Sequence, residues 1–137
     1  MRDMHKNIKV VHVIKPVAVG TTGIGGGQLS AVIDRRGYDS VEFAFNSGGS
    51  ASAADTVTPV VYESSVTDSG FTSVASADLI GDETALTLTT SAGKAKGIGY
   101  RGNKRYLKLR LYGTGTATAL VAAMAILGNP AVAPIAT

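Results

Sequence analysis

Hydrophobic and polar residues alternate most clearly in residues 94–113 of this chain. In the second half of this stretch Leu107, Leu109 and Leu111 occupy every other position. The positions between them carry basic or aromatic side chains, namely Tyr106, Lys108, Arg110 and Tyr112. A period of two is typical of a strand with one face in the core and the other in solvent. Residues 101–104 have the composition of a turn, so we predict a β-hairpin with a basic outer face.

Shorter alternating runs predict further strands along the rest of the chain. They cover residues 8–14, 28–34, 41–45, 56–66 and 85–90, whereas residues 71–80 alternate only weakly. We expect Pro16 to end the first strand and Pro59 to mark an edge strand or a strand start, because proline cannot donate to a ladder. In the second strand we expect Leu29, Ala31 and Ile33 to face inward.

Residues 117–127 are apolar on both sides and fit two structures. Leu120, Met124 and Leu127 have a helical spacing, whereas the flanking Gly-Thr pairs and the many small side chains fit a buried or interface strand. We favour the strand. Its two-sided apolar character makes it a candidate self-association surface, and the residues we assign to that surface are Leu120, Val121, Met124 and Ile126.

These patterns together predict the fold class. The chain has 137 residues, which suits one domain with its own core. About eight strands separated by turns predict an all-β, single-domain antiparallel β-sandwich or barrel. We expect residues 1–7 to form an extended N-terminal arm, 8–127 the sandwich or barrel, and 128–137 an extended C-terminal tail.

Charge is unevenly distributed along the chain. The net charge is only +3, but residues 94–113 hold seven of the thirteen basic residues, and residues 39–83 hold eight acids and no base. Such polarity suits a protein that docks on copies of itself or on a charged partner. Tyr100, Tyr106 and Tyr112 interleave with the basic residues, which is also a pattern of single-stranded nucleic-acid binders. The acidic middle of the chain opposes that interpretation.

The sequence contains no recognisable catalytic, metal or cofactor site. There is no cysteine, and His5 and His12 are the only histidines, without a carboxylate cluster nearby in sequence. No Gly-x-Ser-x-Gly elbow occurs, and the Gly-x-Gly-x-x-Gly match at 97–102 precedes a strand instead of the helix that a dinucleotide site needs. The longest apolar run, 117–127, is too short to cross a membrane. We therefore expect neither an enzyme nor a membrane protein, and no cofactor.

Four stretches resemble a known family. They are 33–43 (IDRRGYDSVEF), 77–81 (ADLIG), 98–107 (IGYRGNKRYL) and 125–130 (AILGNP). In these the chain is similar to the capsid cement, or head decoration, proteins of tailed bacteriophages, often encoded beside the major capsid protein. The similarity runs from about Asn7 to Pro130, rests on turns and strands without a catalytic signature, and is weakest at 46–54.

The resemblance implies a non-enzymatic virion protein, made in the host cytoplasm, that binds the outer surface of the capsid and stabilises the shell. Its partner would be the major capsid protein, and the family commonly forms trimers at local threefold axes or dimers at twofold axes. The capsid contacts that we expect lie in the arm and in the basic stretch: Arg2, His5, Lys6, Lys9, Arg101, Lys104, Arg105, Lys108 and Arg110. Two alternatives are a head–tail connector or tail-tube component, and a single-stranded nucleic-acid-binding β-barrel.

Overall fold

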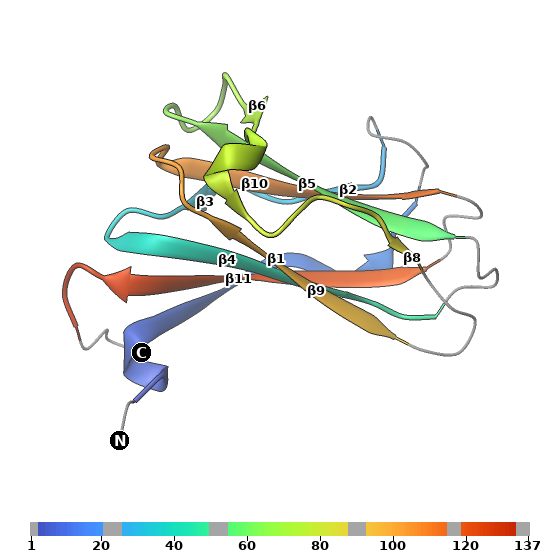
Figure 1. The fold of residues 1–137 in the computed structure, drawn as a ribbon, viewed down its shortest axis with the longest axis horizontal. Coiled ribbons are helices and arrows are strands. Elements are labelled where there is room, and N and C mark those ends of the chain that lie inside the picture. Colours follow the sequence, from blue (N-terminus) through green and yellow to red (C-terminus); the bar gives the residue numbers. More distant parts are fainter. Residues whose placement is uncertain (1–2, 21–25, 50–54, 88–92, 115–118, 134–137) are drawn as a thin grey trace.

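The protein is an antiparallel β-sandwich of two sheets (Figure 1). The structure, a computed structural model, describes residues 3–20, 26–49, 55–87, 93–114 and 119–133. No α-helix occurs in these ranges; two short 3-10 turns, η1 (His5–Asn7) and η2 (Ser76–Asp78), are present. The predicted all-β class is thus confirmed, and the sheets form a sandwich instead of a closed barrel.

Sheet A forms the lower layer in Figure 1 and has five strands in the order β1-β11-β4-β9-β7. They are β1 (Ile8–Ala18), β11 (Leu120–Pro130), β4 (Tyr38–Ser47), β9 (Lys94–Tyr100) and β7 (Leu79–Ile80). All of its pairs are antiparallel. The pairing of the first and last strands runs from Ile8 opposite Gly128 to Ala18 opposite Leu120. The edge strand β1 therefore joins the two ends of the chain.

Sheet B forms the upper layer and is built around two long strands. Those are β10 (Tyr106–Thr114) and β5 (Thr56–Ser64), and the short ones are β2 (Gln28–Leu29), β3 (Ile33–Asp34), β6 (Thr72–Ser73) and β8 (Leu86–Thr87). β2 and β3 pair with the outer side of β10, while β6 and β8 pair with β5. Short flanking strands leave little continuous edge for unwanted pairing.

The core lies between the sheets and is made of alternate residues of the long strands. Phe43, Ile98, Leu107, Leu109 and Leu111 are all fully buried. The alternation predicted for residues 106–112 is therefore confirmed, with the three leucines inward. The segment 117–127 is a strand from its described residue 120 onward, as favoured, and it continues to Pro130.

The predicted β-hairpin of residues 94–113 is wrong. β9 pairs with β4 and β7 in sheet A, whereas β10 pairs with β2, β3 and β5 in sheet B. Residues 101–105 cross from one sheet to the other. The alternation identified the buried face of each strand, but a sandwich has two inward faces, and the pattern does not say to which sheet a strand belongs.

Both prolines behave differently from expectation. β1 continues through Pro16 to Ala18, because the proline lies exposed on an edge strand where the register shifts between Ile14 and Val17. Pro59 lies inside β5, which has neighbours on both sides. The Val61 N–H donates to Glu83 Oε1 at 2.6 Å on the side away from β10. By alternation the nitrogen of Pro59 points to that same side, between the stretches paired with β8 and β6.

The predicted strand 28–34 is divided in two, and Leu29 and Ala31 are exposed instead of inward. Between its halves Ser30 is buried, and its Oγ accepts the Leu109 N–H at 2.9 Å. A side chain thus replaces a backbone acceptor there. At the N-terminus, residues 5–7 form a 3-10 turn instead of an extended arm. Residues 1–2, with Arg2, and 134–137 of the tail lie outside the described residues.

Candidate interaction surfaces

Basic residues from distant parts of the chain meet at one end of the sandwich, which we call the basic end. Here β1 begins opposite the end of β11, β4 begins, β9 ends and β10 begins (left in Figure 1). Its basic side chains belong to His5, Lys6, Lys9, Arg35, Arg36, Arg101, Lys104 and Arg105. Acidic residues at the same end are Asp3, Asp34, Asp39, Glu63, Asp68 and Asp78. The seven lysines and arginines outnumber these six acids by one.

The N-terminal part of the basic end is exposed and locally held. No residue of η1 is buried, and Met4 is 70% exposed. The Asn7 N–H donates to Met4 O at 3.0 Å, and the Asn7 side-chain amide donates to Asp3 O. This turn projects from the start of β1 at the edge of the molecule (Figure 1). It presents the predicted contacts His5, Lys6 and Lys9 to solvent.

The crossover of residues 101–105 forms the other part of the basic end and is braced by Arg35. The guanidinium donates from Nε to Lys104 O at 2.6 Å and from Nη2 to Gly102 O at 3.0 Å. It also lies 5.4 Å from the centre of the Tyr100 ring. No contact was predicted for Arg35 from the sequence. The only signal was its place in the stretch 33–43, which carries the family resemblance.

Tyr100 is buried beneath this crossover and links the sheets. Its hydroxyl donates to Glu63 Oε2 at 2.5 Å and accepts the Lys104 N–H at 2.9 Å. Burial raises the pKa of Tyr100 to about 12, and the hydrogen bond to Glu63 acts in the same direction. A Cβ on Gly102 would lie 2.4 Å from this hydroxyl, so the crossover can pack this closely only with glycine there.

The basic side chains predicted in 101–110 are largely engaged within the molecule. Arg101 Nε donates to Ala77 O at 2.9 Å, and Arg105 binds both carboxylate oxygens of Asp34 at 2.8 and 2.7 Å. Further along β10, Lys108 Nζ lies 4.3 Å from the centre of the Phe71 ring, and Arg110 Nη1 donates to Gly26 O at 2.7 Å.

The predicted contact set therefore divides between two surfaces. Lys108 and Arg110 lie on the outer face of sheet B, away from the basic end. Arg101, Lys104 and Arg105 lie at the basic end with His5, Lys6 and Lys9. From the sequence these residues were predicted to form one group. The sequence shows where charges are dense along the chain, but not on which surface of the sandwich each charge lies.

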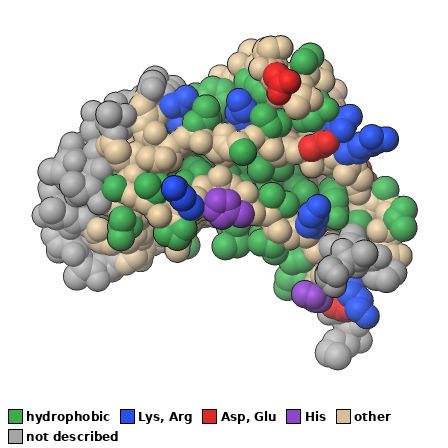
Figure 2. Space-filling view, turned by 180° about the vertical axis from the view of Figure 1, so that it is seen from behind, with side chains coloured by type: hydrophobic (Ala, Val, Ile, Leu, Met, Phe, Trp, Pro, Cys, Tyr) green, Lys and Arg blue, Asp and Glu red, His purple; other side chains and the backbone are tan. Residues whose placement is uncertain are grey.

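The outer face of sheet A is the second candidate surface and is mostly apolar. Val10, Ile80, Leu120 and Met124 project from it and are 57, 61, 62 and 46% exposed. Figure 2 shows hydrophobic side chains along the lower margin of the molecule, which is hollowed. A groove of about 670 Å³ runs across this face, and a second hollow of about 390 Å³ lies toward the basic end. Large exposed apolar patches mark interaction sites.

The predicted self-association residues all belong to β11, and all but one of them face outward on this side of sheet A. Leu120, Met124 and Ile126 point outward, as a strand period of two requires. Val121 points into the core and is 1% exposed, so its side chain is not available to a partner. The prediction grouped neighbouring residues, whereas only alternate residues of a strand share a face.

Glu42 is half-buried on this face beside two glycines of β9. A Cβ on Gly97 would lie 2.2 Å from its Oε1, and one on Gly99 would lie 2.9 Å from its Oε2. Desolvation raises the pKa of this carboxyl. Within the described ranges the carboxylate has no hydrogen-bond or ion-pair partner. Glu42 was not predicted as a site residue, because a single glutamate in a strand looks like any other outward-facing polar residue.

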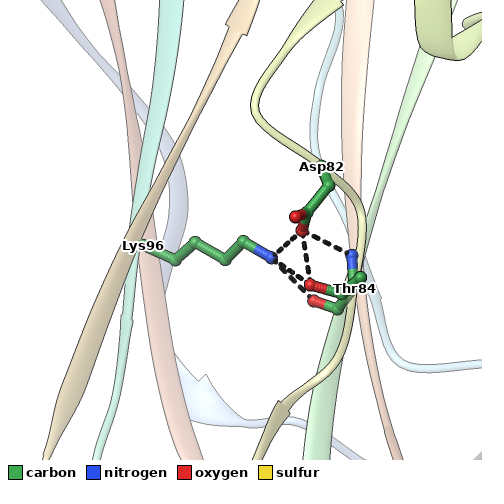
Figure 3. Close-up of polar contacts among 3 residues, drawn as sticks. All are labelled: Asp82, Thr84 and Lys96. Atoms are coloured by element: carbon green, nitrogen blue, oxygen red, sulfur yellow. Dashed lines mark hydrogen bonds and ion pairs between the residues drawn. The ribbon is translucent and has the colours of Figure 1, made fainter.

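Lys96 ties sheet A to the loop that leads into β8 (Figure 3). Its Nζ donates to Asp82 Oδ1 at 2.6 Å, to Thr84 O at 2.8 Å and to Thr84 Oγ1 at 2.9 Å. The ion pair and the Thr84 hydrogen bonds hold the pKa of Asp82 well below its usual range. Asp82 and Glu83, adjacent in sequence, both make contacts that hold the loop in place. Glu83 caps the N–H of Val61 described above.

Among the described residues, no group of three or more potential metal ligands is present and no helix is long and apolar enough to span a membrane.

Comparison with known proteins gives little information about these surfaces. No protein-family model and no curated protein matches the sequence.

Two solved β-rich domains are similar in structure. The CBM22-1 xylan-binding domain of Xyn10C from Paenibacillus barcinonensis aligns with a TM-score of 0.44 and 14% identity, over 95% of this chain and 83% of that one. The K1 cleaved adhesin domain of Lys-gingipain from Porphyromonas gingivalis W83 aligns with a TM-score of 0.41 and 16% identity, over 86% and 74%. Likenesses this weak say nothing about what this chain binds.

Proposed function

We propose that the protein is a non-enzymatic virion structural protein that binds the outer surface of a bacteriophage capsid and stabilises the shell. The observation that carries this proposal is the basic end. Two segments from opposite halves of the chain, each expected from the sequence to contact the capsid, come together there. The major capsid protein is the proposed partner, and the decorated virion is the proposed location.

The basic end has the properties of a docking surface. η1 buries no residue of its own, so its His5 and Lys6 side chains can contact a partner without cost to the core. The crossover is held in place by Arg35, so Lys104 is presented from an ordered loop. Ordered charges at an interface steer encounter and fix orientation more than they add affinity. A clamp between neighbouring shell subunits needs that kind of orientation.

Binding to expanded, undecorated capsids tests the proposal. Wild-type protein is expected to pellet with capsids saturably, to occupy regular lattice positions in images and to raise the temperature at which capsids lose their contents. The triple variant Lys6→Ala, Lys9→Ala, Lys104→Ala should bind about tenfold more weakly or less well still, since each change removes a charge from the contact. Lys15→Ala, an exposed lysine further along β1, is the matched control and should bind like wild type.

Two results would contradict the proposal. One is full capsid occupancy by the triple variant, which would remove the basic end from the contact. The other is a wild-type chain that leaves capsids bare. In that case a closed ring in solution would indicate a head–tail connector or tail-tube component. Salt-sensitive binding to single strands would indicate a nucleic-acid binder.

A further inference from the structure

We infer that the outer face of sheet A is covered by the same face of a second copy of this chain, in a two-fold contact that pairs His12 of each copy with Glu42 of the other. This inference concerns the protein in solution and does not depend on capsid binding. It rests on the positions of these two ionisable groups and on the exposed apolar side chains of the face.

The groove crosses the four long strands of this face. Its lining includes Val10 and His12 from β1, Met124 from β11, Ala44 from β4, and Ala95 and Gly97 from β9. Leu120 and Met124 stand exposed on β11, which lies between β1 and β4. In a two-fold contact the same patch of both copies meets, so residue i of one copy contacts j of the other and j contacts i.

Two ionisable side chains lie on either side of β11. His12 lies exposed on β1, opposite Met124, and Glu42 lies on β4, opposite Ile126. Neither side chain has a hydrogen-bond partner within the described part of the chain. An unpaired carboxylate that is partly desolvated is unfavourable, and an imidazole N–H from a partner would satisfy it.

One two-fold axis pairs the His12 of each copy with the Glu42 of the other. Any two points on a face are exchanged by an axis that lies in the interface and runs midway between them. For His12 on β1 and Glu42 on β4 that axis passes over β11, the strand between them. The same rotation lays β11 of one copy against β11 of the other, so Leu120 and Met124 of the two copies pack at the centre of the contact.

The apolar content of the face favours a lasting contact over an open surface. Four of the eight exposed large hydrophobic side chains in the described residues project from this one face. Homodimer interfaces are more apolar than the general protein surface. Lys96 also lines the groove, but its Nζ is already bound by Asp82 and Thr84, so it adds no unpaired charge to the face. In the two-fold contact each His12 meets a Glu42, so no like charges come together at these positions.

Sedimentation equilibrium of the full chain over a range of concentrations provides the first test. Wild-type protein is expected to dimerise, and Met124→Lys is expected to raise the dimer dissociation constant about tenfold or more, since it places a charge at the centre of the contact. Leu29→Lys is the matched control: Leu29 is 45% exposed against 46% for Met124, but it lies in sheet B. It should leave dimerisation unchanged. A wild-type monomer at every concentration, a trimer, or equal effects of both lysines would overturn the inference.

Charge exchange between copies provides a sharper test. His12→Glu places two glutamates together at both ends of a homodimer, and Glu42→Lys places lysine against His12 at both ends. Each variant alone should dimerise about tenfold more weakly or less well still. An equimolar mixture should recover dimers, because the introduced glutamate then meets the introduced lysine and the native pair forms at the other end. Circular dichroism melting confirms that each variant is folded. A mixture no more dimeric than its components would overturn the two-fold arrangement.

Discussion

The Tyr100 hydroxyl donates a 2.5 Å hydrogen bond to Glu63 Oε2, and this contact joins the two sheets of the sandwich. Tyr100 ends β9 in sheet A and Glu63 lies near the end of β5 in sheet B. The same hydroxyl accepts the Lys104 N–H, so it also fixes the crossover between the sheets. One buried phenol thus organises the basic end.

Removing this hydroxyl is expected to destabilise the fold. Tyr100→Phe should lower the free energy of unfolding by about 1–3 kcal/mol, because the Glu63 carboxylate and the Lys104 N–H lose their partner. Urea unfolding measures the change. Tyr112→Phe, on the half-exposed outer face of β10, is the control and should change stability by less than about 0.5 kcal/mol. Equal effects of the two changes would contradict the assigned role.

The raised pKa of Tyr100 also predicts a dependence of stability on alkaline pH. The unfolded chain loses the phenolic proton near pH 10, whereas the folded protein holds it until about pH 12. This contribution is fully present below pH 10 and is lost as the pH rises to 12. Wild type should therefore lose more stability than Tyr100→Phe across that interval. Parallel unfolding curves at pH 9 and 11 provide the measurement, and identical losses would contradict it.

The Asp34–Arg105 pair predicts an acid-side effect. Arg105 holds the pKa of Asp34 at about 2, chiefly through the paired hydrogen bonds to its carboxylate. Stability from this pair is present above the unfolded pKa near 4 and is lost as the pH falls through 2. Both side chains are 43% exposed, so solvent screening keeps this contribution small.

Replacing the arginine isolates this pair. Arg105→Lys keeps the charge but loses the two-point contact, so the pKa of Asp34 should rise part of the way toward its ordinary value. Carboxyl chemical shifts in an acid titration measure that change directly. Arg36→Lys is the control, since its guanidinium only acts on Asp34 through space. An unchanged Asp34 pKa in Arg105→Lys would show that charge alone sets it.

Glu42 and Gly97 are expected to be energetically coupled. Gly97→Ala should destabilise the chain by about 1 kcal/mol, because the new Cβ displaces the carboxylate. In a Glu42→Ala background the same change should be neutral or stabilising, since glycine weakens a strand interior. A double-mutant cycle measures the coupling. Gly99→Ala should be rescued less, because Ile80 Cβ lies 3.1 Å from that site. Additive effects at Gly97 would contradict this close packing.

The desolvated Glu42 carboxyl gives a second readout of the same site. Its folded pKa is raised, so its favourable contribution is fully present below the unfolded pKa and is lost as the pH rises. Glu42→Gln is therefore expected to be more stable than wild type at pH 7 in dilute protein. The difference should shrink below about pH 4, where the wild-type carboxyl is protonated in both states. A constant difference across pH would contradict this explanation.

The sequence was most informative where local chemistry decides the structure. Leu107, Leu109 and Leu111 alternate with polar residues, and a half-buried strand is the structure that satisfies that pattern. Residues 120–127 are predictable as a strand for a related reason, because small apolar residues on both sides suit a central strand. Both features depend on the order of polar and apolar residues within one segment, which can be read directly from the sequence.

Partners across space were not predictable in the same way. The pairing of β9 with β4, and not with β10, depends on which sheet each strand joins, and alternation is identical for both choices. The bracing role of Arg35 and the site of Glu42 depend on residues more than fifty positions away along the chain. Pro16 and Pro59 show the same limit. A strand tolerates a proline where no neighbouring strand needs its missing N–H, and the sequence of the strand itself does not show where that is.

The pairing of β1 with β11 has a consequence for the order in which the two sheets can form during synthesis. Ile8 lies opposite Gly128, so β1 must wait for a strand far later in the chain before it finds its neighbour. β4 also needs β11 on one side, which leaves sheet A incomplete until β11 has been made. Sheet B needs β10 but not β11 and can pair earlier. Sheet B is therefore expected to form first, and β1 is secured only when β11 arrives.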